Sequence, residues 1–318
     1  MSIRIRRTKV IKMEIDDLLK LAGEDEALKD KETAHLTINL NKVVSKNIVP
    51  GLHIDTEEIE DGINVKVIVD EGIVIEKKVH MCFGVTHDKA LQKIVMEIDV
   101  KKNAKISILS HCIFPKAIDV KHIMDAKVRV REGASYSYEE KHIHSMEGGI
   151  EVYPKAEIEL DKNARFKTEF ELIKGRVGKL DIDYEITGKE GSVMEMTSKV
   201  SGRSDDLIKI REAGNLIGEK ARGVLTSRVA VRGNAKAEVY NVMVATAPYA
   251  RGHVDCKEII QDNGVARAIP IVEVKHPKAH ITHEAAIGSV DTKQLETLMS
   301  RGLGEEEAVD LIIEGLLS

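Results

Sequence analysis

The chain has 318 residues, of which 42% are hydrophobic and 32% are charged, and its net charge is −5. This apolar content is enough for a packed core and excludes wholesale disorder. A negative balance argues against a dedicated nucleic-acid-binding protein, and no apolar stretch approaches the roughly 20 residues of a membrane helix. Cys82, Cys112 and Cys256 are too far apart in sequence for a disulfide framework. We therefore expect a cytoplasmic protein with no membrane or nucleic-acid partner.

The chain divides by pattern into three segments, residues 1–33, 34–290 and 291–318. The first is basic at its start and then places Ile11, Ile15 and Leu18 at helical spacing. It lacks the apolar run and the cleavage site of a secretory signal. The spacing predicts an N-terminal helix over residues 10–21.

The long middle segment consists of short runs in which apolar and polar residues alternate. The clearest runs are residues 64–69, 95–100, 105–109, 126–130, 157–160, 165–172, 180–186 and 237–244. Alternation with a period of two predicts strands that bury one face.

A turn former followed by a small residue precedes many of these runs. The pairs are Asn103-Ala104, Gly133-Ala134, Lys155-Ala156, Asn163-Ala164, Gly191-Ser192, Asn234-Ala235 and Lys278-Ala279. Asn and Gly accept the left-handed backbone of a tight corner, and a small neighbour lets adjacent coils stack closely. Their irregular spacing argues against a propeller. With aromatic residues at only 3%, the pattern favours a β-solenoid filled by aliphatic side chains, and leaves a β-sandwich open.

The last segment, residues 291–318, predicts two short helices. Asp291 and Gln294 have capping-box spacing, and Gly302 ends the first helix. The second helix, over residues 305–316, begins with three acidic residues at its positive end. Its apolar stripe consists of Ala308, Leu311, Ile312 and Leu316. Such helices either cap the open end of the sheet or dock on a partner.

The chain lacks the motifs of several enzyme and cofactor classes. It contains no GxxxxGK[ST] phosphate loop and no GxGxxG, GxSxG, HExxH or CxxC sequence. The chain alone therefore shows no self-sufficient catalytic motif.

Candidate metal ligands fall into three regions. In residues 253–256, His253 and Asp255 would share one face of a strand and Cys256 the other, unless a bulge brings them together. Thiolate, imidazole and carboxylate all bind iron, but the local sequence alone favours a buried inert cysteine beside exposed polar residues. In residues 280–284, His283 and Glu284 either need buried partners or lie on a solvated edge strand.

The third region is scattered along the chain and consists of His80, Cys82, His111, Cys112, His122, His142 and His144. His142 and His144 are two residues apart and share a strand face. Stacked coils could bring the others together, although unrelated core and surface positions explain them as well.

The C-terminal third of the chain resembles the SufB/SufD family, the scaffold subunits of iron–sulfur cluster assembly. The resemblance is carried by the run 269–317, with Ile269-Pro270, His283-Glu284-Ala285, 299–302 and 305–308, and upstream by 250–256, 80–84 and His111-Cys112. The chain is similar to a short archaeal form of this family.

The resemblance implies a right-handed parallel β-helix (β-solenoid) between an N-terminal and a C-terminal helical segment. It also implies a homodimer, or a heterodimer with a SufB/SufD paralogue, and a SufC-like ABC ATPase as partner. This chain is then expected to be a non-catalytic scaffold with no nucleotide site of its own. The C-terminal residues that would bind this ATPase are Leu295, Leu298, Met299, Arg301, Leu311 and Ile312.

The resemblance further implies a transient iron–sulfur cluster, with Cys256 as thiolate ligand, Glu284 as carboxylate ligand and His283 as imidazole ligand. His253 and Asp255 stand beside Cys256 as further cluster-binding candidates. Two alternatives remain at this stage, a structural adaptor with inert cysteines and a β-helix enzyme acting on polysaccharides. Scarce aromatic residues argue against the second.

Overall fold

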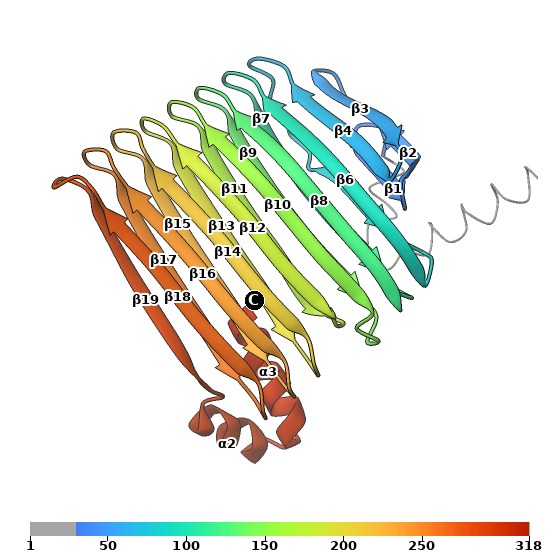
Figure 1. Ribbon diagram of the computed structural model, residues 1–318, viewed down its shortest axis with the longest axis vertical. Coiled ribbons are helices and arrows are strands. Elements are labelled where there is room, and N and C mark those ends of the chain that lie inside the picture. The colour runs from blue at the N-terminus through green and yellow to red at the C-terminus, as the bar shows by residue number, and fades with distance from the viewer. Residues whose placement is uncertain (1–29, 318) are drawn as a thin grey trace, which may run out of the picture.

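The computed structural model describes residues 30–317, so the helix predicted over residues 10–21 lies outside the described residues. Two sheets of ten and nine strands face each other (Figure 1). The ten-stranded sheet holds β1 (His35–Asn39), β2 (Lys42–Asn47), β5 (Val79–Gly84), β7 (Lys105–Phe114), β9 (Ser135–His144), β11 (Arg165–Lys174), β13 (Val193–Gly202), β15 (Arg222–Val231), β17 (Arg251–Ile260) and β19 (His280–Ser289). The nine-stranded sheet holds β3 (Leu52–Ile59), β4 (Gly62–Val69), β6 (Lys89–Val100), β8 (Asp119–Val130), β10 (Ile150–Leu160), β12 (Lys179–Gly188), β14 (Leu207–Leu216), β16 (Lys236–Ala245) and β18 (Val265–Val274).

From β5 onward the chain coils, placing successive strands alternately in the two sheets. Each strand pairs in parallel with the strand one full turn later. The predicted parallel β-solenoid is therefore confirmed, and every alternating run named above lies within a strand.

The coil is more regular than the turn markers suggest. Lys89 pairs with Asp119, thirty residues on, and Lys179 pairs with Leu207, twenty-eight residues on. The regularity is hard to see in the sequence because residues of different types occupy the left-handed turn positions. Asn103, Lys220 and Tyr249, for example, all have φ between 56° and 60°. The Lys155-Ala156 pair, expected before a strand, instead lies in the middle of β10.

In each strand every second residue points its side chain into the space between the two sheets, and these side chains form the core. In β12, for example, Leu180, Ile182 and Ile186 are fully buried. Small residues after the turns, among them Ala104 and Ala134, are also buried, as close stacking of coils requires.

The two ends of the solenoid differ. At the N-terminal end, β1 with β2 and β3 with β4 form antiparallel pairs that the sequence pattern did not separate from the coils. At the other end, β18 and β19 are the last strands of their sheets. Their inward positions, such as Val272 and Val274, are 37% and 47% exposed, whereas Met243 and Ala245, which pair with them one coil earlier, are fully buried.

The C-terminal helices are α2 (Thr292–Ser300) and α3 (Glu305–Leu317), as predicted. The Asp291 side chain accepts a hydrogen bond of 2.7 Å from the Gln294 amide. The stripe predicted for α3 is confirmed in part, since Ala308 is buried and Ile312 packs partly against the cluster that holds the helix. The other buried positions are Val309, Ile313 and Leu317, which pack against the ten-stranded sheet. No helix in residues 30–317 is long and apolar enough to cross a membrane.

The helices do not cap the open end. The cluster that holds α3 includes Ile173 of β11, Ala230 of β15 and Ile259 of β17, all near the carboxyl ends of their strands. In Figure 1 both helices sit at that end of the strands, and β19 stays exposed.

Candidate functional site

The two strands β17 and β19 carry the predicted ligands, and their register sorts them onto two faces. Cys256 is opposite Ala285, Asp255 is opposite Glu284, and no bulge interrupts either strand. Cys256 therefore faces the core, whereas Asp255 and Glu284 face outward. The bulge that would bring His253, Asp255 and Cys256 together does not form.

Cys256 is fully buried, yet its neighbourhood is partly polar. It is opposite Ser227 in β15, and Glu258, two residues along β17, points into the same interior with 2% exposure. Burial, helped by the negative charge of Glu258, raises the pKa of the Cys256 thiol to about 12. The sulfur is a protonated thiol at neutral pH, and binding a metal would have to displace its proton.

Asp255 and His253 form contacts on the outer face. The Asp255 carboxylate is ion-paired with the Arg228 guanidinium and lies 3.8 Å from Lys257 Nζ. His253 Nδ1 lies 2.8 Å from Thr282 Oγ1 of β19. Both residues thus line the outer surface between the last coils.

His283 and Glu284 are exposed on β19, on opposite faces of the strand. His283 pairs with Val254 and so shares the inward face with Cys256, whereas Glu284 shares the outer face with Asp255. Within one chain, the described residues do not bring Cys256, Glu284 and His283 into a single ligand cluster. The expectation of a solvated edge strand for residues 280–284 agrees with the structure.

Buried polar residues in the interior near Cys256 were missed by the sequence reasoning. Ser198 donates a hydrogen bond to Glu212, and Ser227 bonds with Asn241 across the two sheets at 2.9 Å. Burial raises the pKa of the Glu212 carboxyl to about 7 and that of Glu258 to about 7. The signal was present in the alternation, since both glutamates stand at inward positions of their strands.

The scattered histidines and cysteines separate into two groups. Cys112, His122, His142 and His144 point inward from β7, β8 and β9 and are buried together. Cys82 pairs with His111 on the other face of the ten-stranded sheet. Coil stacking thus assembles a cluster that spacing alone could not predict.

The inward cluster gains a carboxylate from Glu140. Cys112 Sγ lies 3.8 Å from one oxygen of Glu140, and His142 Nε2 lies 2.7 Å from the same oxygen. Among residues 30–317 this is the one group of three whose ligand atoms lie within 4.8 Å of one another.

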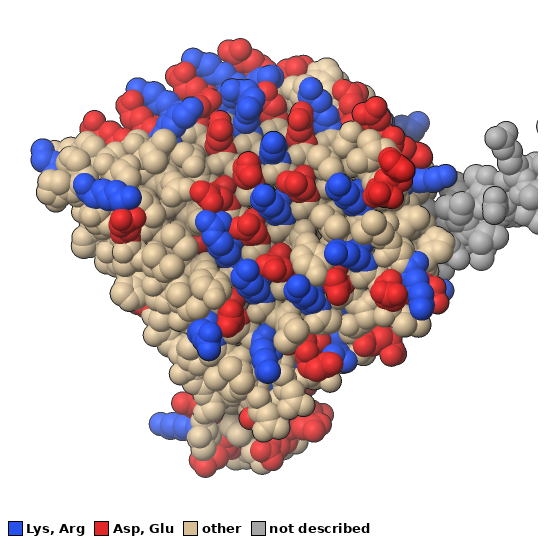
Figure 2. Space-filling model, in the orientation of Figure 1, with Lys and Arg blue, Asp and Glu red and all other residues tan. Residues whose placement is uncertain are grey.

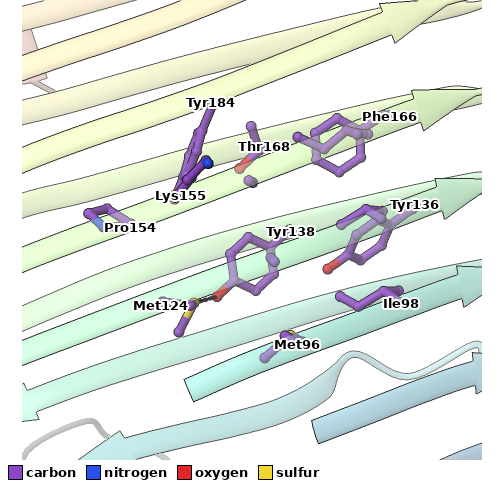
Figure 3. A pocket seen from close by; sticks show the side chains of 14 residues that line it. Met96, Ile98, Met124, Tyr136, Tyr138, Pro154, Lys155, Phe166, Thr168 and Tyr184 are labelled. Atoms are coloured by element: carbon purple, nitrogen blue, oxygen red, sulfur yellow. Dashed lines mark hydrogen bonds between the residues drawn. The ribbon is translucent and has the colours of Figure 1, made fainter. Parts of the chain in front are cut away.

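A cavity of about 30 Å³ lies between the sheets next to this cluster (Figure 3). Its wall includes Tyr138, whose hydroxyl lies 3.7 Å from Met124 Sδ, and Tyr184, whose hydroxyl donates to Glu140 at 3.3 Å. This volume holds about one water molecule, which is too small for an organic substrate. At this point the solenoid interior therefore has no substrate pocket of the size found in enzymes.

The predicted partner-binding residues lie on and between α2 and α3. Leu298, Leu311 and Ile312 line an open groove between the helices. Met299 and Leu311 are 42% and 48% exposed, and Arg301 is exposed. Leu295 and Ile312 also pack partly against the cluster that holds α3.

Comparisons with known proteins agree with this geometry. Residues 86–316 match the family model "SUF system FeS cluster assembly, SufBD core domain". The chain belongs to the SufBD family. Its resemblance to SufB/SufD proteins, inferred from the C-terminal third, is thereby confirmed.

Relatives of this SufBD chain include archaeal proteins of similar length. An iron–sulfur cluster assembly SufBD family protein of Methanocaldococcus jannaschii is 38% identical, over 96% of this chain and 97% of its own. One from Pyrococcus horikoshii is 37% identical, over 100% of this chain and 96% of its own. The iron–sulfur cluster assembly protein SufB of Bacillus subtilis is 38% identical over 21% of this chain and 15% of its own. The family is one of iron–sulfur cluster assembly proteins.

Proposed function

We propose that this SufBD protein is a non-catalytic scaffold on which an iron–sulfur cluster is assembled at the open end of the solenoid. The observation that carries the proposal is the position of Cys256, one strand away from the exposed edge strand that bears His283 and Glu284. Thiolate, imidazole and carboxylate are donors that iron accepts. The cluster is cargo in this proposal and is passed on.

A second copy of the chain would complete the site. The last coil exposes Val272, Val274 and Ile287 on its inward face, at 37% to 47% exposure, and both terminal strands offer an unpaired edge. Figure 2 shows many Lys, Arg, Asp and Glu side chains over the middle strands and few over the end that carries β18 and β19. An apolar unpaired end of this kind suits a dimer, with a second copy or a SufBD paralogue.

Dimerisation would also bring together ligands that lie on opposite faces of the strands within one chain. Cys256 and His283 face the interior and Glu284 faces outward within one chain. A partner chain seated against β19 would contribute a second set of the same three residues across the junction. His253 and Asp255 would line the outer side of this junction between the two chains.

ATP hydrolysis by a SufC-like ABC ATPase, bound to the groove between α2 and α3, would supply the free energy that opens the dimer junction at β19. The exposed apolar residues of that groove, Leu298, Met299 and Leu311, support a docking role. Since α3 packs on β15 and its cluster reaches Ile259 of β17, a movement of the helices would reach the strand that bears Cys256. Nucleotide binding would then reside on the partner.

Anaerobic reconstitution with ferrous iron and sulfide tests the cluster site. Wild type is expected to gain iron together with sulfide and visible cluster absorbance, and Cys256→Ser is expected to lose the sulfide and the cluster absorbance while keeping its fold. Cys82→Ser is the matched control, because Cys82 is also buried but belongs to β5. Equal loading of the Cys256→Ser variant and wild type would refute the assignment.

Sedimentation and pull-down experiments test the two interfaces separately. Val274→Lys should shift the chain from dimer to monomer, whereas Ile118→Lys, at a position 60% exposed in a turn, should not. Leu311→Asp should abolish co-purification with the ATPase, whereas Leu207→Asp, at a position of equal exposure on β14, should not. A wild-type monomer at micromolar concentration, or an unchanged pull-down, would contradict the respective interface.

A further inference from the structure

We infer that Cys112, Glu140 and His142 form a second site, for a divalent transition-metal ion of the Zn²⁺ or Fe²⁺ type, inside the solenoid. The three residues are 0%, 1% and 3% exposed, and they come from the neighbouring strands β7 and β9. Because β9 and β17 are four strands apart, this site lies about 19 Å from Cys256. The inference does not depend on the proposed function.

A chain of hydrogen bonds determines which nitrogen of His142 carries a proton. His144 Nδ1 lies 3.1 Å from the carbonyl oxygen of Arg176, which only accepts, so that Nδ1 must donate. A neutral His144 ring that donates through Nδ1 has Nε2 as its acceptor. His142 Nδ1, 3.1 Å away, donates to it. The remaining nitrogen of a neutral His142, Nε2, thus directs a lone pair at Glu140.

A second series of hydrogen bonds determines which nitrogen of His122 carries a proton. Gln92 donates through Nε2 to the carbonyl oxygens of Leu40 and Gly84, at 2.6 and 3.2 Å, which leaves Gln92 Oε1 as an acceptor. His122 Nδ1 donates to that oxygen at 2.8 Å. His122 Nε2 is buried without a hydrogen-bond partner, and its ring centroid lies 6.2 Å from that of His142. His122 therefore offers an unprotonated nitrogen in the same interior, but this nitrogen lies outside the group whose ligand atoms are within 4.8 Å of one another and would have to move closer to take a fourth coordination position.

The spacing of the donor atoms fits a tetrahedral ion after a small adjustment. Donors around Zn²⁺ at its usual bond lengths of about 2.0–2.3 Å are about 3.3–3.8 Å apart. Cys112 Sγ and the Glu140 oxygen are already 3.8 Å apart, and the contact of 2.7 Å between Glu140 and His142 would widen by about 0.6 Å. A histidine that binds a metal through one ring nitrogen usually donates a hydrogen bond through the other, as His142 does to His144.

Charge balance also permits a divalent ion in this buried site. Without metal, a neutral Cys112 thiol and one proton shared between Glu140 and His142 keep the buried cluster uncharged. An ion of charge +2 that displaces both protons meets one thiolate and one carboxylate, so the net charge of the interior does not change. A buried site can accept such an exchange because no uncompensated charge is created.

The test uses Zn²⁺ and Co²⁺ as probes on the full chain. Each ion is offered to the folded protein and, because the site is closed, also during refolding. Wild type should retain about one ion per chain after desalting, and with Co²⁺ it should show thiolate-to-cobalt absorption bands. Retention of neither ion by either route would overturn the inference.

Variants locate the ion and separate ligand loss from misfolding. Cys112→Ser should abolish the thiolate bands, and the isosteric Glu140→Gln should lower the retained metal at least tenfold while its metal-free unfolding stays cooperative. His144→Phe should weaken binding by about 10- to 100-fold, because it removes the group that accepts the hydrogen bond of His142 Nδ1 and so orients the ring. Cys256→Ser should retain the ion with unchanged bands. Unchanged binding in Glu140→Gln, or loss in Cys256→Ser, would place the ion elsewhere and overturn the assignment.

Discussion

The pH dependence of stability should reveal the buried carboxyl of Glu212. This side chain is 1% exposed, receives one hydrogen bond from Ser198, and has a second oxygen without a partner. Burial raises its pKa from 4.5 to about 7. A raised pKa in the folded state means that the contribution to stability is fully present below pH 4.5 and is lost as the pH rises through about 7.

The magnitude follows from the size of the pKa difference. At about 1.4 kcal/mol for each pKa unit, the step from 4.5 to about 7 amounts to about 3 kcal/mol. Glu212→Gln keeps the acceptor for Ser198 and cannot ionise. The free energy of unfolding of the variant, relative to wild type, should therefore rise by about 3 kcal/mol between pH 4 and pH 8.

Urea unfolding of both proteins across this pH range measures the difference. Glu258, with its own pKa raised to about 7, remains in both proteins and cancels in the comparison. Glu195→Gln, at an exposed position of β13, is the control and should show no pH-dependent difference. If the stability gap between Glu212→Gln and wild type were the same at pH 5 and pH 8, the argument from burial would be refuted.

Three further predictions concern packing and access. Phe170 is 1% exposed between the sheets, and its replacement by alanine should lower the free energy of unfolding by about 3–5 kcal/mol. A loss below about 1 kcal/mol would mean that the core collapses around the gap. Cys256 should react with iodoacetamide at pH 7.5 only after unfolding, because it is buried and its pKa is raised to about 12; mass spectrometry showing rapid native labelling would contradict this. Arg232→Met removes the ion pair between the residue that follows β15 and Asp310 of α3, so amide exchange in α3 should become about fivefold faster, equivalent to about 1 kcal/mol, while exchange in β12 stays unchanged. Equal rates in α3 would show that apolar packing alone holds the helix.

The sequence was sufficient for the elements that depend on local pattern. Alternation predicted strands such as β11 and β12, and the Asp291 cap predicted α2, because these signals act within a few residues. The choice of a solenoid followed from turn formers beside small residues, since close stacking excludes large side chains at those corners. The antiparallel pairs at the N-terminal end carried no distinct signal, because an antiparallel strand shows the same alternation as a parallel one.

The candidate sites depended on the tertiary structure. Alternation places Cys256 and Glu284 each on one face of its strand, but only the register of β17 with β19 shows that these faces are opposite. Cys112 and Glu140 are twenty-eight residues apart and meet because one turn of the coil has nearly that length. Local sequence determines the direction of a side chain, whereas the number of residues in each turn decides which distant side chains become neighbours.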